Sequence, residues 1–482
     1  MARRALFTGL AAAVAGTASR KVVAAPPTSS VGDADPSALL TKLVRRVTFG
    51  PNQYELNLAQ TLGYDAYLDY HINYDQIDDS AIAPRIAPLT TLNRIYADIY
   101  TLSGTQVINE LIEATLIRAT YSKRQLFERM MEFWSDHFNI YVEKENCAWL
   151  KIADDRDALR PNAMGFFSDL LASSATSPAM LVYLDNHTSY AGNPNENYAR
   201  ELMELHTMGT DGGYTQTDVQ EVARCFTGWT FHGNSAGYPL AGVFRFNGSQ
   251  HDNGEKRVFG QFIAAGGGLQ DGLTVLQILT DHPSTAKFIC TKLCKRFLSY
   301  DPPRSVINAA VAKFTSTGGN IAQTMRTILA APHVSDAPVK FKRPFHAFVS
   351  AMRSVDAEMI ASGSVRNQLK NAGHLVFYWF SPDGFPDKLD FWSGLLLPRW
   401  NFGANLMLGA LTGVSANTAA FFAGLTTANQ MADRINTAIF GGEMTTADRN
   451  RIRDYLLPDA PTPARQQEAL GLAIGSPGFQ WY

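Results

Sequence analysis

Apolar side chains recur every three or four residues along most of the chain, which is the spacing of one face of an α-helix. The segment "DPSALLTKLVRRVTFGP" at 35–51 shows this spacing, with Pro36 suited to a first helical turn and Gly50-Pro51 suited to a stop. The spacing also continues through later segments, at about 303–330, 344–355, 388–412, 427–440 and 446–473. The pattern therefore predicts a mainly α-helical fold.

One stretch departs from the helical spacing and predicts β-structure. Val243–Phe246 and Arg257–Phe259 flank a segment rich in glycine and asparagine, which favours a small β-hairpin insertion around 243–262. We find no repeat of fixed length and no long low-complexity linker after residue 35. We therefore expect residues 35–482 to form a single large multi-helical domain.

The segment "NENYARELMELHTMG", residues 195–209, has the most informative polar pattern. Its apolar side chains gather on one side of a helix, and Glu196, Arg200 and Glu204 run down the other side, each four residues after the last. A ladder of ion pairs on a solvated face explains that spacing. His206 lies near the apolar side, where a buried imidazole needs partners for both ring nitrogens, so it is either a satisfied core histidine or a ligand.

The predicted helix at 122–138 repeats this arrangement. His137 shares a stripe with aromatic residues, whereas Glu128 and Glu132 lie opposite that stripe, which predicts a solvated acidic face. His137 and His206 both face inward in this interpretation. They are therefore candidates for one shared pocket.

Polar residues further along the chain allow two interpretations. His251-Asp252 lies in the predicted hairpin turn, where it is either an ordinary turn element or part of a charged loop that contacts a ligand. Glu221 and Arg224 are three residues apart on a predicted helix, so they can pair with each other.

Four cysteines are too few for a disulfide framework in 482 residues. Cys290 and Cys294 lie four residues apart among apolar neighbours, which favours buried thiols over a shared metal. Cys147 and Cys225 have no ligand partners nearby in the sequence. They would form a disulfide only if the fold brought them together in an oxidising compartment.

The overall composition is that of a globular protein, with 46% hydrophobic residues, 18% charged residues and a formal net charge of −2. Such a near balance of charge gives no electrostatic reason to bind nucleic acid or an anionic membrane surface. We therefore predict no nucleic-acid partner.

The first thirty residues predict an export signal. Arg3 and Arg4 precede an apolar run from Ala5 to about Ala18, followed by small residues and prolines. The run is too short to cross a bilayer core of about 30 Å, and the paired arginines favour the twin-arginine route. The alternative is a disordered basic start. We expect a periplasmic or secreted protein with no membrane span in the mature chain.

Eight segments, in this order, resemble the family called domain of unknown function 1800 (DUF1800): "LVRRVTFGP", "MMEFWSDHFNI", "MLVYLDN", "NPNENYARELMELHTMG", "GGYTQTDVQEVARCFTGWTF", "HDNGEKRVFG", "HPSTAKFICTKLCKRF" and "LLLPRWNF". The resemblance spans about residues 37–482. It implies a bacterial, exported, mostly helical protein without an agreed activity, and an exported partner protein from another uncharacterised family. In the later segment "AGHLVFYWFSPDGFPDKLDFW" the chain departs from the family, with His374 and Phe385 at positions where the family usually has glutamine and tryptophan.

The leading hypothesis is an exported enzyme whose polar pocket lies on the 195–209 helix. Metal-assisted hydrolysis or carboxylate/histidine acid–base hydrolysis would use Glu201 and Glu204 as ligands or bases. His206 and His137 would act as ligands or proton carriers, and a divalent metal is the candidate cofactor. Further ligand-binding positions would be Glu196, Asn197, Arg200, Arg224, His251 and Asp252.

The alternative hypothesis is a non-catalytic envelope, assembly or binding protein in which the same residues form a buried ion-pair network that fixes helix packing. It expects an arginine beside each of these carboxylates and no open pocket at His137 or His206. A pocket with unpaired, converging carboxylates would favour the enzyme.

Overall fold

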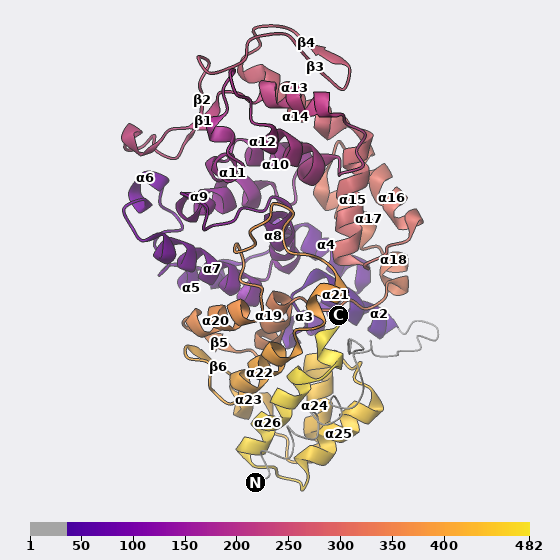
Figure 1. Ribbon diagram of the computed structural model, residues 1–482. Helices are drawn as coiled ribbons and strands as arrows, with labels where there is room; N and C mark the ends of the chain where they lie inside the picture. Colours follow the sequence, from indigo (N-terminus) through magenta and orange to yellow (C-terminus); the bar gives the residue numbers. More distant parts are fainter. Residues whose placement is uncertain (1–35) are drawn as a thin grey trace, which may run out of the picture.

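The computed structural model describes residues 36–482 and confirms a mainly helical fold (Figure 1). The predicted export signal lies outside these residues. The N-terminal helices include α2 (Pro36–Val47), α3 (Gln53–Leu62), α4 (Tyr64–Ile72), α7 (Gly104–Tyr121) and α8 (Gln125–His137). The middle of the chain includes α9 (Cys147–Ala153), α10 (Phe167–Ala175), α11 (Pro178–Tyr183), α12 (Glu196–Glu201), α13 (Gln216–Cys225), α14 (Leu269–Asp281), α15 (Pro283–Phe297), α16 (Arg304–Ser316) and α17 (Ile321–Ile328). The C-terminal part includes α19 (Pro344–Ser354), α20 (Gly363–Asn371), α21 (Leu389–Trp392), α22 (Leu396–Met407), α24 (Ala428–Phe440), α25 (Thr446–Leu456) and α26 (Pro463–Gly475).

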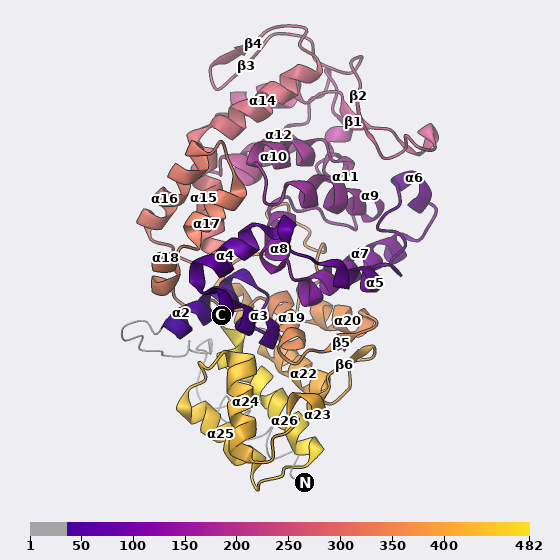
Figure 2. The same ribbon diagram turned by 180° about the vertical axis from the view of Figure 1, so that it is seen from behind.

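The helices pack around two large groups of buried apolar side chains. The first contains Trp134 and Trp229 and joins α8 to helices α10–α17. The second contains Phe348 and Phe402 and joins α7 to the C-terminal helices. Figures 1 and 2 show α8 near the centre of the molecule, between the part built from the middle of the chain and the part built from α19–α26. Helix α8 is thus positioned to connect the two parts.

The short strands form two-stranded antiparallel sheets, but not with the predicted pairing. β2 (Phe244–Phe246) pairs with β1 (Trp229–Phe231), and β3 (Lys256–Val258) pairs with β4 (Gln261–Ile263). The prediction that the strands near 244 and 257 pair with each other is therefore wrong. The reason is a tighter turn: Phe259 and Gly260 both have positive φ, of 51° and 75°, which is the geometry of a two-residue type I′ hairpin turn. A third small sheet pairs β5 (Glu358–Met359) with β6 (Val414–Ser415).

The segment between α20 and α21 crosses the front of α8 in the view of Figure 1. Asn139, just after α8, fixes it by donating its side-chain amide to the carbonyls of Trp379, at 2.9 Å, and Ser381, at 2.7 Å. Gly384 packs so closely that a Cβ there would lie 2.1 Å from the carbonyl oxygen of Asp136. We call residues 379–385 the crossing loop.

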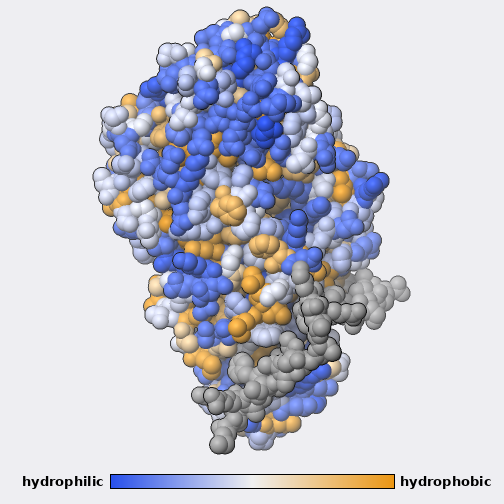
Figure 3. All heavy atoms as spheres, viewed as in Figure 1, coloured by the Kyte–Doolittle hydropathy of each residue, from blue (hydrophilic) through white to orange (hydrophobic). Residues whose placement is uncertain are grey.

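The surface differs between the two ends of this face (Figure 3). The part around α13, α14 and strands β3–β4 is mostly polar, whereas apolar patches lie near and below the centre of the face. Exposed apolar side chains of the segment from the crossing loop to α22 include Phe380, Phe391 and Leu397. Within residues 36–482, no helix is both long enough and apolar enough to cross a membrane.

Candidate functional site

The 195–209 segment begins as a normal helix and ends as a wider π-helical turn. Asn195 caps α12 by accepting hydrogen bonds from the backbone N–H groups of Asn197, at 2.8 Å, and Tyr198, at 3.3 Å. The turn at Leu202–Thr207 is closed by the N–H of Met208, which donates to the carbonyl of Met203 at 2.8 Å. Its extra residue changes the direction of His206 relative to a regular helix.

The predicted ladder on this segment is present and lies at the surface. Arg200 is 3.7 Å from Glu196 and 3.9 Å from Glu204, and the side chains of Arg200 and Glu196 are 37% and 40% exposed. Exposed ion pairs of this length contribute little to stability. Glu196, Arg200 and Glu204 therefore form the solvated face that the ordinary interpretation predicted.

Glu201 is different from its neighbours. It is half-buried, and among the described residues its carboxylate has neither an ion pair nor a hydrogen-bond partner. Burial, together with the nearby charge of Glu204, raises the pKa of Glu201. Of the two predicted catalytic carboxylates, Glu204 has Arg200 as an ion-pair partner and Glu201 has none among the described residues.

The fold brings His137 and His206 together, as predicted. Their ring centroids lie 6.2 Å apart, and Nε2 of His137 is 3.0 Å from the carbonyl oxygen of His206. Nζ of Lys292, on α15, lies 2.8 Å from Nδ1 of His137. Because an ammonium group can only donate, Nδ1 accepts and the ring proton resides on Nε2, which donates to the His206 carbonyl.

Burial controls the charge of this group. It lowers the pKa of Lys292 to about 8 and that of His206 to about 3. Burial and the neighbouring Lys292 charge also lower the pKa of His137 well below its usual range. Both imidazoles are therefore neutral at physiological pH, and Nε2 of His206 is buried without a hydrogen-bond partner. No pattern near Lys292 in the sequence predicts its contact with His137, because the two residues lie 155 positions apart.

The acidic side of α8 contradicts the prediction of a solvated face. Glu128 and Glu132 are buried, with their side chains 7% exposed. Glu132 contacts Arg296 and Arg343, each at 2.6 Å. Periodicity placed these carboxylates opposite the aromatic stripe correctly, but that side of α8 also packs against protein.

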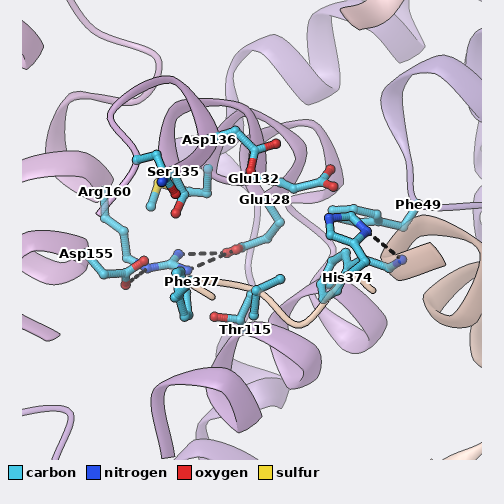
Figure 4. Close-up of a pocket in the computed structure, with 15 residues that line it drawn as sticks. Phe49, Thr115, Glu128, Glu132, Ser135, Asp136, Asp155, Arg160, His374 and Phe377 are labelled. Carbon is cyan, nitrogen blue, oxygen red and sulfur yellow. Dashed lines mark hydrogen bonds and ion pairs between the residues drawn. The ribbon is translucent and has the colours of Figure 1, made fainter. Parts of the chain in front are cut away.

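The buried ion pairs form two charge-balanced groups. In the first, Arg343 also contacts Asp136, at 2.6 Å, so that Glu132 and Asp136 balance Arg296 and Arg343. In the second, shown in Figure 4, Arg160 lies between Glu128, at 3.0 Å, and Asp155, at 2.8 Å. Arg118 completes the second group at 3.7 Å from Asp155. Each group therefore carries two negative and two positive charges.

A small cavity of about 30 Å³ lies among these residues, with Ser135 and Asn139 also on its wall (Figure 4). This volume accommodates one or two water molecules. His374 lies at its edge, and its Nδ1 accepts a hydrogen bond from the N–H of Phe345 at 3.1 Å. Phe385 packs on the His374 ring with the centroids 4.4 Å apart, so the two departures from the family pattern contact each other. Neither His137 nor His206 lines the cavity.

His251 and Asp252 belong to a separate polar group. Nε2 of His251 is 3.1 Å from the carboxylate of Asp271, which Lys256 contacts at 2.7 Å. Arg224 lies between Glu221 and Asp252, at 2.8 Å from each. No hydrogen bond or ion pair among the described residues connects this group to His137 or His206, so the fold does not unite the predicted site residues into one centre.

Among residues 36–482, no group of three or more histidine, cysteine or acidic side chains is arranged to hold a metal ion. All four cysteines are buried free thiols. That agrees with the prediction for Cys290 and Cys294, and the disulfide considered between Cys147 and Cys225 is not formed.

Residues 233–237, "GNSAG", have the Gly-x-Ser-x-Gly spacing of a hydrolase nucleophile. Ser235 lies in an exposed 3-10 turn between β1 and β2 instead of a strand-to-helix elbow. The spacing therefore does not create a nucleophile of that type here.

Comparison with known proteins gives one family. The description "Protein of unknown function (DUF1800)" matches residues 42–481, nearly the whole described chain. No curated protein matches the chain, and no solved structure matches it.

Proposed function

The chain belongs to the DUF1800 family, whose function is unknown, and we propose that it is a non-catalytic envelope protein that acts by binding, with its charged clusters holding the helices together. The observation that carries this proposal is the pairing of its inward-facing carboxylates. Glu132 and Asp136 share Arg343, and Glu128 and Asp155 share Arg160.

Paired buried charges suit a structural role because removing either partner leaves an uncompensated charge in a medium of low polarity. They suit catalysis poorly because both carboxylate oxygens of Glu132 are occupied by guanidinium groups. Asp252, a predicted ligand-binding residue, is likewise held by Arg224. Among the predicted site residues, these contacts support the structural alternative for Arg224 and Asp252, whereas Glu196, Arg200 and Glu204 lie on a solvated face.

Enzymatic acid–base chemistry is the second candidate, and one specific observation favours it. Glu201 is half-buried without a partner and has a raised pKa, while Lys292 contacts neutral His137 and has a pKa of about 8. Groups whose pKa values are moved in these directions can each exchange protons near neutral pH. Metal-assisted hydrolysis has no ligand set among the described residues to support it.

We also propose export to the periplasm or the exterior by the twin-arginine route, and an exported partner from another uncharacterised family. The support for export is the Arg3-Arg4 pair before the apolar run. Replacing both arginines by lysine should retain the protein in the cytoplasm, as followed by cell fractionation and immunoblotting. Unchanged export of this variant would refute the twin-arginine route.

Elemental analysis of the purified protein tests the non-catalytic role against metal-assisted hydrolysis, with Glu201→Ala and His206→Ala variants alongside. We expect no stoichiometric divalent metal in any of the three proteins after dialysis against zinc, manganese, magnesium or calcium. A stoichiometric metal that folded variants lose would overturn the proposal and establish a metal site at the 195–209 segment.

A further inference from the structure

A second, larger hollow shares no lining residue with the small cavity among the buried ion pairs. It is an open groove of about 740 Å³ between α10 and α14, and its lining also includes His282 and Pro283 at the start of α15. Its volume lies within the range of about 300–1,000 Å³ that is typical of ligand sites. The helices α10 and α14 that form its walls lie side by side in Figures 1 and 2.

The walls of the groove present amide and hydroxyl groups. α14 contributes Gln270, Thr274 and Gln277, and β4 contributes Gln261. Ser168 and Asp169 face them from α10. Between these polar groups lie aliphatic surfaces, among them Leu273, which is 37% exposed.

Most of these polar side chains make no hydrogen bond within the described part of the protein. Gln277 donates to Asp281 at 2.8 Å, but the side chains of Gln261, Gln270 and Thr274 have no hydrogen-bond partner among the described residues. An amide offers both a donor and an acceptor, and a hydroxyl offers the same in one atom. Such groups match the paired hydroxyls of a sugar, and aliphatic surface matches the C–H faces of its ring.

The charge of the groove argues against other ligand classes. Its lining contains no lysine or arginine, and its charged residues are Asp169 and Asp281. Phosphates, sulfates and nucleic acids are therefore disfavoured, because the groove offers no cationic side chain to bind them and its aspartates repel their negative charge. The lining contains no phenylalanine, tyrosine or tryptophan, which disfavours a hydrophobic helix as occupant.

We propose that the α10–α14 groove binds a neutral oligosaccharide through Gln261, Gln270, Thr274 and Gln277. This inference rests on the proposed binding function and names its ligand class. The groove is open and runs along one helix, so it suits a chain of sugar units better than a single enclosed one.

Isothermal titration calorimetry with maltohexaose, cellohexaose and chitohexaose tests the proposal on the purified mature protein. At least one of these should bind, and Gln270→Ala/Thr274→Val should weaken that binding at least tenfold. A bulky Thr274→Trp variant, which fills the groove, should abolish it. Gln323→Ala is the matched control because Gln323 is an exposed helical glutamine outside the groove, on α17, and its binding should equal that of the wild type.

Thermal unfolding of each variant shows whether it is folded, and all three altered residues are at or near the surface. If none of the three oligosaccharides binds, or if binding survives Thr274→Trp in a folded protein, the groove proposal is wrong. A reducing-end assay on the bound oligosaccharide separates this outcome from failure of the non-catalytic role. Binding accompanied by cleavage would refute the non-catalytic role and leave the groove assignment standing.

Discussion

The ammonium group of Lys292 donates a 2.8 Å hydrogen bond to Nδ1 of His137, a residue 155 positions earlier in the sequence. The contact fixes the imidazole in the form protonated on Nε2, and that nitrogen in turn donates to the carbonyl of His206. These two hydrogen bonds thus connect α15 to α8 and α8 to the π-helical turn. Burial lowers the pKa of Lys292 to about 8, so its protonation changes in mildly alkaline solution.

Lys292 should make the protein relatively more stable as the pH rises above neutrality. Its folded pKa of about 8 lies below the unfolded value of about 10.4, so between these values the unfolded chain holds a proton that the folded chain has lost. Stability therefore rises with pH in that window. Urea unfolding of wild type and Lys292→Met from pH 7 to 10 measures the effect, and a constant difference between the two proteins would contradict it.

His137 and His206 should differ in their importance to stability. His137→Phe leaves the partly buried Lys292 ammonium without its acceptor and should cost about 2–3 kcal/mol. His206→Phe removes a ring whose Nε2 already lacks a partner and should cost less than about 1 kcal/mol. Urea unfolding at pH 7 measures both. Equal losses would show that ring packing, and not the lysine contact, determines the result.

Removing the charge of Glu132 should strongly destabilise the protein. Glu132→Gln leaves Arg296 and Arg343 without their shared carboxylate, at an expected cost of about 3–5 kcal/mol in the free energy of unfolding. Glu196→Gln is the matched control, and its exposed, longer ion pair predicts a change within about 0.5 kcal/mol. A loss below about 1 kcal/mol for Glu132→Gln would contradict a structural role for the network.

The same carboxylate should contribute to acid unfolding. Burial alone would raise the pKa of Glu132, but Arg296 and Arg343 hold it well below its usual range. Its stabilising effect is therefore complete above the unfolded pKa of about 4.3 and is lost as the pH falls below that value. The difference in stability between wild type and Glu132→Gln should shrink from pH 5 to pH 2, as measured by urea unfolding. A difference that stays constant over this range would argue against the arginine pairing.

Gly384 should tolerate no side chain, because it brings the crossing loop against α8. Gly384 and Gly424 both have positive φ, of 74° and 79°, so Gly→Ala at either costs about 1–2 kcal/mol for the backbone. Only at Gly384 would the new Cβ meet a carbonyl oxygen, that of Asp136, whereas the space at Gly424 is open. Gly384→Ala should therefore be the less stable variant and should speed chymotrypsin cleavage near Phe380. Similar cleavage rates in the two variants would contradict this packing.

The sequence predicts features that depend on near neighbours. Apolar spacing locates most helices, and the four-residue intervals of Glu196, Arg200 and Glu204 predict their ion pairs. It cannot predict that the acidic side of α8 is buried, because Arg343 lies 211 residues after Glu132 and no local pattern points to it. The turn that determines the β-strand pairing was missed for another reason, since Phe259 is not a residue type that favours positive φ.

The ion pairs of α8 also bear on the order in which the chain can fold during its synthesis. Translation delivers Glu132 first, Arg296 follows with α15 in the middle of the chain, and Arg343 comes last, just before α19. Until then, burial of α8 would place unpaired carboxylates in an apolar environment. We therefore expect α8 to stay in contact with water in the growing chain, and the N-terminal helices to complete their packing only after Arg343 has left the ribosome.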